Sequence, residues 1–332
     1  MYPSLYQINT RIWLNELTTR LGHPIDLATI PEAELDALAE KGFDWVWLLG
    51  IWQTGDAGRQ VSRSQAGWAN DFRQALSDFR PEDVAGSPFA IQQYVVHREF
   101  GGPAALARLR MQLKDRGIRL LLDFVPNHTA LDCPWISSHP EYYVGGSQAD
   151  LAREPQNYLR LATGARTQIL AHGRDPYFSG WPDTLQLNYF HAGFRIAMKE
   201  VLLTVARQCD GVRCDMAMLL LPDVFRRTWG ERARPTDNTF AVESSFWLEA
   251  IAAVRLAEPN FILMAEVYWD LEWNLQQEGF DYTYDKRLYD RLHGQDAEGC
   301  RAHLRADLGF QNKLVRFLEN HDEPRAPATF PP

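Results

Sequence analysis

Residues 120–128 read LLLDFVPNH, an apolar run that ends on a carboxylate, an amide and an imidazole. Three further stretches have the same form: DGVRCD at 210–215, FILMAE at 261–266 and LVRFLENHD at 314–322. Short apolar runs bounded by polar residues are typical of buried strands in parallel sheets. In parallel α/β barrels the reactive side chains stand at the carboxyl ends of the strands. The four stretches therefore predict one reaction site, built at the ends of successive strands.

The rest of the chain alternates strand and helix patterns. We predict strands at 5–13, 43–52, 118–125, 210–215, 261–267, 280–284 and 314–318, and helices at 31–41, 104–116, 194–208 and 244–257. This rhythm favours the α/β class and a TIM-type (β/α)8 barrel. We assign residues 1–128 and 192–332 to the barrel, and we expect 129–191 to be a long irregular insertion, of a length that is usually functional.

The predicted barrel is incomplete after its seventh strand. Ten residues follow Asp322, and no eighth strand is seen among them. A barrel that lacks one strand has two unpaired edges and an exposed seam. We therefore expect either a fragment or a barrel that is closed in an unusual way.

The acids at the strand ends fit the cleavage of a glycosidic bond. That reaction needs one carboxylic acid to protonate the leaving oxygen and one carboxylate to attack or stabilise the sugar carbon. Glu266 follows five apolar residues, so desolvation is expected to raise its pKa, as a proton donor requires. Arg213 lies two residues before Asp215 on the same strand face, where its charge favours the ionised carboxylate.

These residues resemble the motifs of the α-amylase family of glycoside hydrolases, family 13, from Tyr6 to the end of the chain. The four motifs occur in order: Asp123, Asn127 and His128; Gly211, Arg213 and Asp215; Glu266; and Asn320, His321 and Asp322. The resemblance implies a retaining mechanism with Asp215 as nucleophile, Glu266 as general acid and then base, and Asp322 as transition-state stabiliser. It also implies that Arg213, His128 and His321 position the substrate, and that Tyr94 stacks on the sugar. Residues 129–191 are implied to form a small inserted subdomain over the cleft.

Two departures from the family pattern bear on the substrate. Phe89-Ala90 stands where many relatives have Tyr-Asp, and Met216 to Leu219 lacks the Lys-His pair of true α-amylases. The sequence therefore does not predict a starch α-amylase. Within the inserted stretch, Trp181-Pro182-Asp183 resembles an additional family motif, and Asp183 is open to two interpretations, a sugar contact or a loop hydrogen bond.

Two polar residues near the third strand end are predicted to act behind the substrate contacts. Asp123 is expected to support Arg213 or the strand ends. Asn127 is expected to hydrogen-bond a loop, with calcium ligation as the alternative. No cofactor is required by the predicted chemistry, and Ca²⁺ is the one metal that the resemblance raises.

The amino-acid composition of the chain limits the kinds of molecule that it is expected to bind. The formal net charge is −9, which disfavours nucleic acid and leaves neutral sugars suitable. The resemblance implies an α-linked oligosaccharide as the substrate. No apolar run approaches the ~20 residues of a membrane span, so we expect no membrane partner and a cytoplasmic location. The four cysteines show no metal spacing and are expected to be free thiols. A catalytically silent member that acts as a carbohydrate-binding or assembly module stays as the alternative.

Overall fold

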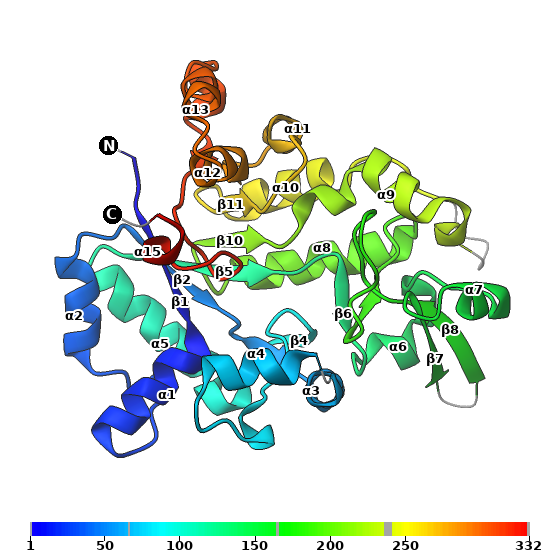
Figure 1. Cartoon of the computed structure of the whole chain (residues 1–332), viewed down its shortest axis with the longest axis horizontal. Coiled ribbons are helices and arrows are strands. Elements are labelled where there is room, and N and C mark those ends of the chain that lie inside the picture. The colour runs from blue at the N-terminus through cyan, green and yellow to red at the C-terminus, as the bar shows by residue number, and fades with distance from the viewer. Residues whose placement is uncertain (1, 66, 164–165, 236–240, 331–332) are drawn as a thin grey trace.

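In the parts of the chain that the structure describes, the main sheet is parallel and has seven strands. The computed structural model describes residues 2–65, 67–163, 166–235 and 241–330. In spatial order the strands are β1 (Leu5–Asn9), β2 (Trp45–Leu49), β5 (Arg119–Phe124), β10 (Gly211–Cys214), β11 (Ile262–Ala265), β12 (Tyr282–Tyr284) and β13 (Leu314–Val315) (Figure 1). The spatial order follows the chain order, as in a (β/α)8 barrel. The predicted fold, a barrel incomplete after its seventh strand, is thus confirmed.

Strand β5 shows why these segments form a buried sheet. Leu120, Leu121 and Leu122 are all at most 2% exposed, because helices cover one sheet face and the barrel interior lies on the other. Each fully buried Leu stabilises the fold by about 1.5–3 kcal/mol relative to an exposed one. Leu121 pairs with Trp47 on one side and with Gly211 on the other, which aligns the carboxyl ends of β2, β5 and β10.

Carboxylates at the amino ends of three strands fix how each of these strands pairs with a neighbouring strand. Each stands one residue before its strand and accepts a hydrogen bond from a backbone N–H at the start of the adjacent strand. The bonds join Ser4 N to Asp44 Oδ2 (2.7 Å), Leu120 N to Asp210 Oδ2 (2.8 Å) and Leu263 N to Asp281 Oδ2 (2.8 Å). These acids lie at the opposite end of the barrel from the predicted site, so they stabilise the sheet rather than contribute to the site.

Helices follow most strands and pack around the sheet, with α5 on β5 and α8 against α10. The main ones are α1 (Thr10–Leu21), α2 (Glu32–Glu40), α5 (Gly102–Asp115), α8 (Ala192–Ala206), α9 (Pro222–Trp229), α10 (Phe246–Ala257), α12 (Lys286–His293) and α13 (Ala297–His303). Shorter ones are α11 (Glu272–Gln277), α14 (Leu308–Gln311) and α15 (Ala326–Thr329). Among the described residues, none of the helices is long and apolar enough to cross a bilayer.

The first predicted strand, 5–13, is wrong in its second half. Strand β1 ends at Asn9, and α1 begins at Thr10. The side chain of Asn9 accepts a hydrogen bond from Ile12 N, so it caps the helix. An N-terminal cap of this kind starts a helix even where the apolar pattern continues as in a strand.

The segment 129–191 is not the irregular stretch predicted from its composition. It holds α6 (Trp135–Ser138), α7 (Gln148–Arg153), the hairpin of β7 (Tyr158–Thr163) and β8 (Arg166–Ala171), and β9 (Thr184–Gln186), which pairs with β6 (His128–Ala130). Figure 1 shows β7, β8 and α7 at the end of the molecule far from both termini. A second insertion follows β2, with β3 (Trp52–Thr54), α3 (Asp56–Ser64), α4 (Trp68–Ala75) and β4 (Ile91–Val96).

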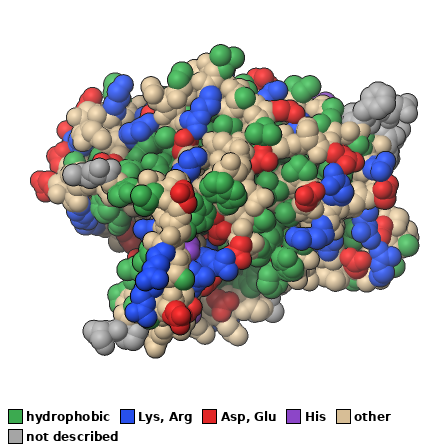
Figure 2. Space-filling view, turned by 90° about the horizontal axis from the view of Figure 1, so that it is seen from above, with side chains coloured by type: hydrophobic (Ala, Val, Ile, Leu, Met, Phe, Trp, Pro, Cys, Tyr) green, Lys and Arg blue, Asp and Glu red, His purple; other side chains and the backbone are tan. Residues whose placement is uncertain are grey.

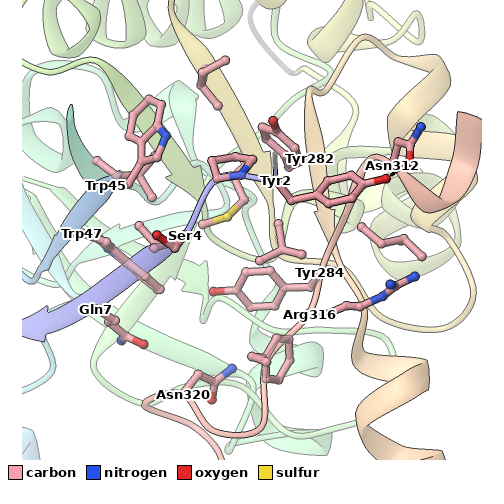
Figure 3. A pocket seen from close by; sticks show the side chains of 18 of the residues that line it. Tyr2, Ser4, Gln7, Trp45, Trp47, Tyr282, Tyr284, Asn312, Arg316 and Asn320 are labelled. Atoms are coloured by element: carbon pink, nitrogen blue, oxygen red, sulfur yellow. Dashed lines mark hydrogen bonds between the residues drawn. The ribbon is translucent and has the colours of Figure 1, made fainter. Parts of the chain in front are cut away.

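A seam runs between the two edge strands of the main sheet. Among the described strands, β1 pairs only with β2, and β13 only with β12. The seam opens into a cavity of about 660 Å³ in the barrel interior. Figure 3 shows Trp45 and Trp47 of β2 on one side of this cavity, and Tyr282 and Tyr284 of β12 on the other.

Two side-chain hydrogen bonds cross the seam, one before and one after β13 in the chain. The hydroxyl of Tyr2 donates to Asn312 Oδ1 at 2.8 Å. Further along β1, Gln7 Nε2 lies 2.8 Å from His321 Nδ1. Side chains therefore link the two edges where backbone pairing is absent among the described residues.

Candidate active site

Arg213 on β10 joins the two acids that follow β10 and β11. Its Nη1 donates to Asp215 Oδ1 at 2.5 Å, and its Nη2 lies 2.8 Å from Glu266 Oε2. The guanidinium is 1% exposed and faces the rings of Trp47 and Phe89 at 5.4 and 5.2 Å. Charge pairing and aromatic faces together hold this cation in the barrel interior. The sequence indicated the contact with Asp215 but missed the one with Glu266.

Glu266 is held from three directions. Besides Arg213, Met216 N donates to its Oε2 at 2.6 Å, and the hydroxyl of Tyr268 donates to its Oε1 at 2.7 Å. Met216 has a left-handed backbone, with φ of 43°. A non-glycine residue in this region stores strain that the surrounding structure must support. Here the strained turn directs the N–H of Met216 at the carboxylate of Glu266. Neither Met216 nor Tyr268 was predicted from the sequence as a site residue.

Burial raises the pKa of both acids. For Asp215 the charge of Arg213 opposes the rise, and the charge of Asp322 adds to it. For Glu266 burial is again the largest cause, Arg213 again opposes it, and the charge of Asp215 raises the pKa further. The pKa of Glu266 is thus raised as expected, and burial is the cause that was expected. Arg213 favours the ionised form of Asp215 as predicted, but burial outweighs it.

Asp322 and His321 enter the site from the loop after β13. The Asp322 side chain is 46% exposed, and its Oδ2 lies 3.2 Å from His321 Nε2. Burial of the carboxyl group and the charge of Glu266 raise the pKa of Asp322 to about 6. Burial and the Arg213 charge lower the pKa of His321 to about 3, so the imidazole is neutral at pH 7.

His128 lies at the start of β6, beside Trp181 and Asp183. The His128 and Trp181 ring centroids are 5.1 Å apart. Burial lowers the pKa of His128 to about 4, and Asp183 opposes that change. Burial also raises the pKa of Asp183, with the charge of His128 opposing it. Asp183 therefore belongs to the electrostatic surroundings of His128.

One cavity of about 780 Å³ contains the three acids, and we call it the acid cavity. Six of the predicted residues line it: His128, Arg213, Asp215, Glu266, His321 and Asp322. Trp181 and Asp183 from the segment 129–191 line it as well. The structure thus brings together acids as far apart in the sequence as Asp215 and Asp322.

An apolar wall of the acid cavity was not predicted. It comes from α4 and the loop before β4, and its aromatic members are Trp68, Phe72, Phe79 and Phe89. The Phe89 ring lies 5.3 Å from that of His321. The replacement of Tyr-Asp by Phe89-Ala90 was the available signal for Phe89, whereas the apolar pattern of α4 resembles that of any surface helix.

Tyr94, predicted to stack on the sugar, lies elsewhere. Its hydroxyl donates to Val125 O at 3.0 Å and accepts from Val125 N at 2.8 Å, and its ring contacts Trp52 and Phe124. It does not line the acid cavity as the described residues form it. Tyr94 therefore joins β4 to the end of β5, and the aromatic ring in the acid cavity is that of Phe89.

Asp123 and Asn127 act behind the cavity. Asp123 is fully buried and accepts hydrogen bonds from Trp47 Nε1 at 3.0 Å and from Gly50 N at 2.7 Å. It thereby holds the end of β2, where Gly50 has a left-handed φ of 76°. Burial raises the pKa of Asp123 to about 7. The charge of Arg213 opposes this rise, so Asp123 interacts with both of the partners predicted for it, the strand end and Arg213.

The residues around Asn127 do not fit a calcium site. Its Oδ1 accepts a hydrogen bond from Gln186 Nε2 at 3.0 Å, so the amide oxygen has a protein partner. Within the parts of the chain that the structure describes, no group of three or more His, Cys, Asp or Glu side chains has the arrangement to hold a metal ion. Calcium needs six to eight oxygen ligands. Asn127 instead joins β5 to β9.

Comparison with known proteins agrees with this arrangement. A family model, the alpha amylase catalytic domain, matches residues 32–330. The alpha-amylase MalA of Haloarcula japonica is 26% identical over 329 residues, which are 97% of this chain and 39% of that protein. An alpha-glucosidase of Culex pipiens is 26% identical over 223 residues, 64% of this chain and 33% of that protein. The chain thus spans well under half the length of these relatives.

The fold recurs in a crystal structure of an alpha-amylase from Lactobacillus plantarum. It superposes with a TM-score of 0.64 at 22% sequence identity, covering 99% of this chain and 65% of that one. The family match spans nearly the whole chain, and the acids stand at the strand ends where the motifs place them. The chain therefore belongs to the alpha-amylase family of glycoside hydrolases.

Proposed function

We propose that this protein cleaves α-glucosidic bonds of oligosaccharides with retention of the anomeric configuration, as a hydrolase or a transglycosylase. The observation that carries the proposal is the convergence of Asp215, Glu266 and Asp322 on one cavity, with Arg213 bonded to the first two. Two of the acids share a cation in a buried site. Neighbouring buried carboxylates disfavour double ionisation, which leaves one group to carry a proton and one to carry charge.

In the proposed mechanism Asp215 attacks the anomeric carbon, and Glu266 protonates the leaving oxygen. A bond forms between an Asp215 oxygen and the sugar carbon as the glycosidic bond breaks. Glu266 then takes a proton from the incoming water or sugar hydroxyl. The acceptor oxygen bonds to the sugar carbon as the bond between that carbon and Asp215 breaks, which releases the sugar and restores both acids. Asp322 places negative charge near the oxocarbenium-like carbon. We expect the carboxyl groups of Asp215 and Glu266 to stand about 5–5.5 Å apart in a substrate complex.

The hydrogen bonds of Glu266 add a condition to this mechanism. A carboxylate that accepts from Met216 N and Tyr268 is stabilised in its charged form. To donate a proton, Glu266 has to become protonated and give up part of this arrangement when substrate binds. We therefore propose that the hydroxyl of Tyr268, which donates a hydrogen bond to Glu266, sets the proton affinity of this carboxyl group.

The surroundings favour a neutral sugar as substrate. Aromatic rings and neutral imidazoles line the acid cavity beside its acids, and Arg213 is already paired with two carboxylates. Acidic and basic side chains are interspersed over the face seen in Figure 2. Trp181 and Asp183 place the segment 129–191 at the wall of the cavity, and we infer that this segment takes part in substrate choice. The alternative, a silent binding module, is disfavoured because all three acids meet in one open cavity.

Hydrolysis of a chromogenic α-glucoside by the chain and by its Asp215→Asn variant tests the proposal. We expect measurable turnover by the chain and a loss of at least about 10³-fold in the variant, because an amide cannot serve as the nucleophile. Equal rates for the two proteins contradict the proposed function. Products of α-linked glucosides, sucrose, trehalose and maltooligosaccharides then identify the linkage, and the first anomer released reports retention.

A further inference from the structure

A small cavity lies between helix α9 and the loop that joins β8 to β9. It has a volume of about 220 Å³, and its lining consists of Arg174, Pro176, Tyr177, Arg227 and Thr228. We call it the arginine cavity. None of these five residues lines the acid cavity as the described residues form it. The arginine cavity is therefore separate from the site of the proposed reaction, and its two guanidinium groups have no part in the proposed mechanism.

Two cation–π contacts join the loop to α9, one in each direction. The guanidinium carbon of Arg174 in the loop lies 4.9 Å from the centroid of the Trp229 ring. The guanidinium carbon of Arg227 on α9 lies 5.9 Å from the centroid of the Tyr177 ring. A ring face attracts a guanidinium group without accepting the hydrogen bonds that its N–H groups direct outward in its plane. Both cations are thus held in place with N–H groups left to bind an acceptor.

Arg174 is a mostly buried cation without a hydrogen-bonded counterion among the described residues. Its side chain is 17% exposed, and its buried Nε has no hydrogen-bond partner there. Its Nη1 lies 3.9 Å from Glu154 Oε2, which is too far for a hydrogen bond. The Glu154 carboxylate already accepts from Asn157 Nδ2 at 3.0 Å and from Arg153 Nε at 3.1 Å. Because a buried charge is costly without partners, the cavity beside Arg174 favours an anion.

Arg227 differs from the preceding residue, Arg226, in its partners. Arg226 donates to Asp223 Oδ1 at 3.0 Å and to Glu243 Oε2 at 2.7 Å. Within the described parts of the chain, the Arg227 side chain forms no ion pair and no hydrogen bond, and its guanidinium group contacts the Tyr177 ring. Two arginines adjacent in the sequence thus carry the same charge, but only Arg227 lines the arginine cavity and has unpaired N–H groups.

The charge and size of the arginine cavity fit a phosphate group. No acidic residue lines it as the described residues form it. The nearby carboxylate of Asp175 uses its Oδ1 to accept hydrogen bonds from Tyr177 N at 2.7 Å and Phe178 N at 2.9 Å. Two guanidinium groups match a doubly charged oxyanion, whose oxygens accept N–H groups in pairs. Because the cavity is smaller than the roughly 300–1,000 Å³ of sites that enclose whole small molecules, it suits one such group.

We propose that the arginine cavity binds a phosphate group between the guanidinium groups of Arg174 and Arg227. The ligand is orthophosphate or the phosphate of a sugar ester, since both present the same oxygens. The bound group joins the segment 129–191, which carries the loop, to α9 of the barrel. This inference goes beyond the proposed function and does not depend on it, because the arginine cavity shares no lining residue with the acid cavity among the described residues.

Calorimetric titration of the full chain with sodium phosphate, at constant ionic strength, tests the site. We expect saturable binding by the chain, and a Kd at least about tenfold higher in Arg227→Gln, because this substitution removes charge-assisted hydrogen bonds. Arg227 is exposed and has no ion-pair partner among the described residues, so its replacement is expected to leave the fold intact. Arg174→Gln is expected to raise the Kd in the same direction. Where Arg174→Gln fails to fold, Arg227→Gln stays informative.

Arg226→Gln is the matched control. It changes the net charge by the same amount as Arg227→Gln, on the same helix, at a residue that does not line the arginine cavity as the described residues form it. We expect its Kd for phosphate to stay within about twofold of that of the chain, since Arg226 N–H groups already have partners. An equal rise in the Kd of both variants indicates attraction by surface charge alone and overturns the inference.

Three probes identify the ligand: orthophosphate, glucose 6-phosphate and acetate. For each probe, the Kd of Arg227→Gln is divided by the Kd of the chain. A ratio of at least about ten for either phosphate probe supports the site, and the phosphate probe that binds the chain more tightly identifies the source. A ratio near one for both phosphate probes, or no saturable binding of either, overturns the inference. Acetate that binds as tightly as phosphate, with the same ratio, contradicts the assignment to phosphate.

Discussion

The side-chain amide of Gln7 on β1 lies 2.8 Å from the imidazole Nδ1 of His321, across the seam between the first and the seventh strand. His321 stands next to Asp322 and lines the acid cavity. The loop that carries the third acid is therefore held from the opposite edge of the sheet. The described residues show no backbone pairing across this seam. The side chain of Gln7 instead joins the first strand to the loop that carries part of the candidate site.

Replacing Gln7 with Leu removes this hydrogen bond at nearly the same volume. We expect kcat on the chromogenic glucoside to fall about tenfold or more, because small displacements of a catalytic group cost on the order of a hundredfold in rate. The melting temperature should change little, since one hydrogen bond contributes about 1 kcal/mol. Gln93→Leu, at an exposed position of β4, is the control. An unchanged kcat in Gln7→Leu contradicts this role of Gln7 in holding the loop of His321 and Asp322.

Replacing Arg213 with Met leaves two buried carboxylates without their cation. Removal of one partner from a buried ion pair costs about 3–5 kcal/mol, so the variant should unfold at lower denaturant concentration. Adding Asp215→Asn and Glu266→Gln to Arg213→Met removes the unpaired charges, and we expect part of the stability to return. Urea titrations of the three proteins measure the effect. A triple variant less stable than Arg213→Met contradicts charge pairing as the reason for the burial of Arg213.

We expect the raised pKa of Asp322 to set the acid side of the pH profile of activity. Burial and the charge of Glu266 raise this pKa to about 6, so the carboxyl group becomes protonated as the pH falls through that value. A protonated Asp322 places no negative charge near the sugar carbon. We expect kcat/KM to fall below about pH 6, measured with the chromogenic glucoside. A constant kcat/KM down to pH 4.5 is incompatible with this assignment.

We expect Tyr268 to affect the alkaline side of the pH profile. Its hydroxyl donates to Glu266 Oε1 at 2.7 Å and stabilises the charged carboxylate. Tyr268→Phe removes that donor, which is expected to raise the pKa of Glu266 and to keep the proposed proton donor protonated to higher pH. The alkaline limb of kcat/KM should therefore move to higher pH. Tyr282→Phe, on the seam side of β12, serves as the control. An alkaline limb that moves to lower pH is the contrary result.

Much of the fold and the site was predictable from local patterns in the sequence. Strands such as β5 are buried on both faces, so their apolar runs are continuous and stand out. Asp215 and Glu266 follow such runs directly, and the register of parallel strands brings these ends together. The residues of a candidate site at strand ends can therefore be predicted one by one.

What the sequence did not show depends on side-chain contacts over long distances. The positions of Phe89 and Tyr268 in the site follow from loop paths, and loop paths are set by tertiary packing. The aromatic ring of Tyr94 is of a type that can stack on a sugar, yet both hydrogen bonds of its hydroxyl join it to the backbone of Val125. The bond between Gln7 and His321 joins residues 314 positions apart, and no local pattern marks it.

Covalent labelling of Asp215 tests the central claim most directly. A slowly turned-over 5-fluoro-α-glucosyl fluoride should react with the chain and leave its sugar on the nucleophile. Mass spectrometry of a protease digest then locates the added mass. The account predicts a label on Asp215, lost in Asp215→Asn. A label on another residue, or turnover of the glucoside with the opposite anomer released first, contradicts it.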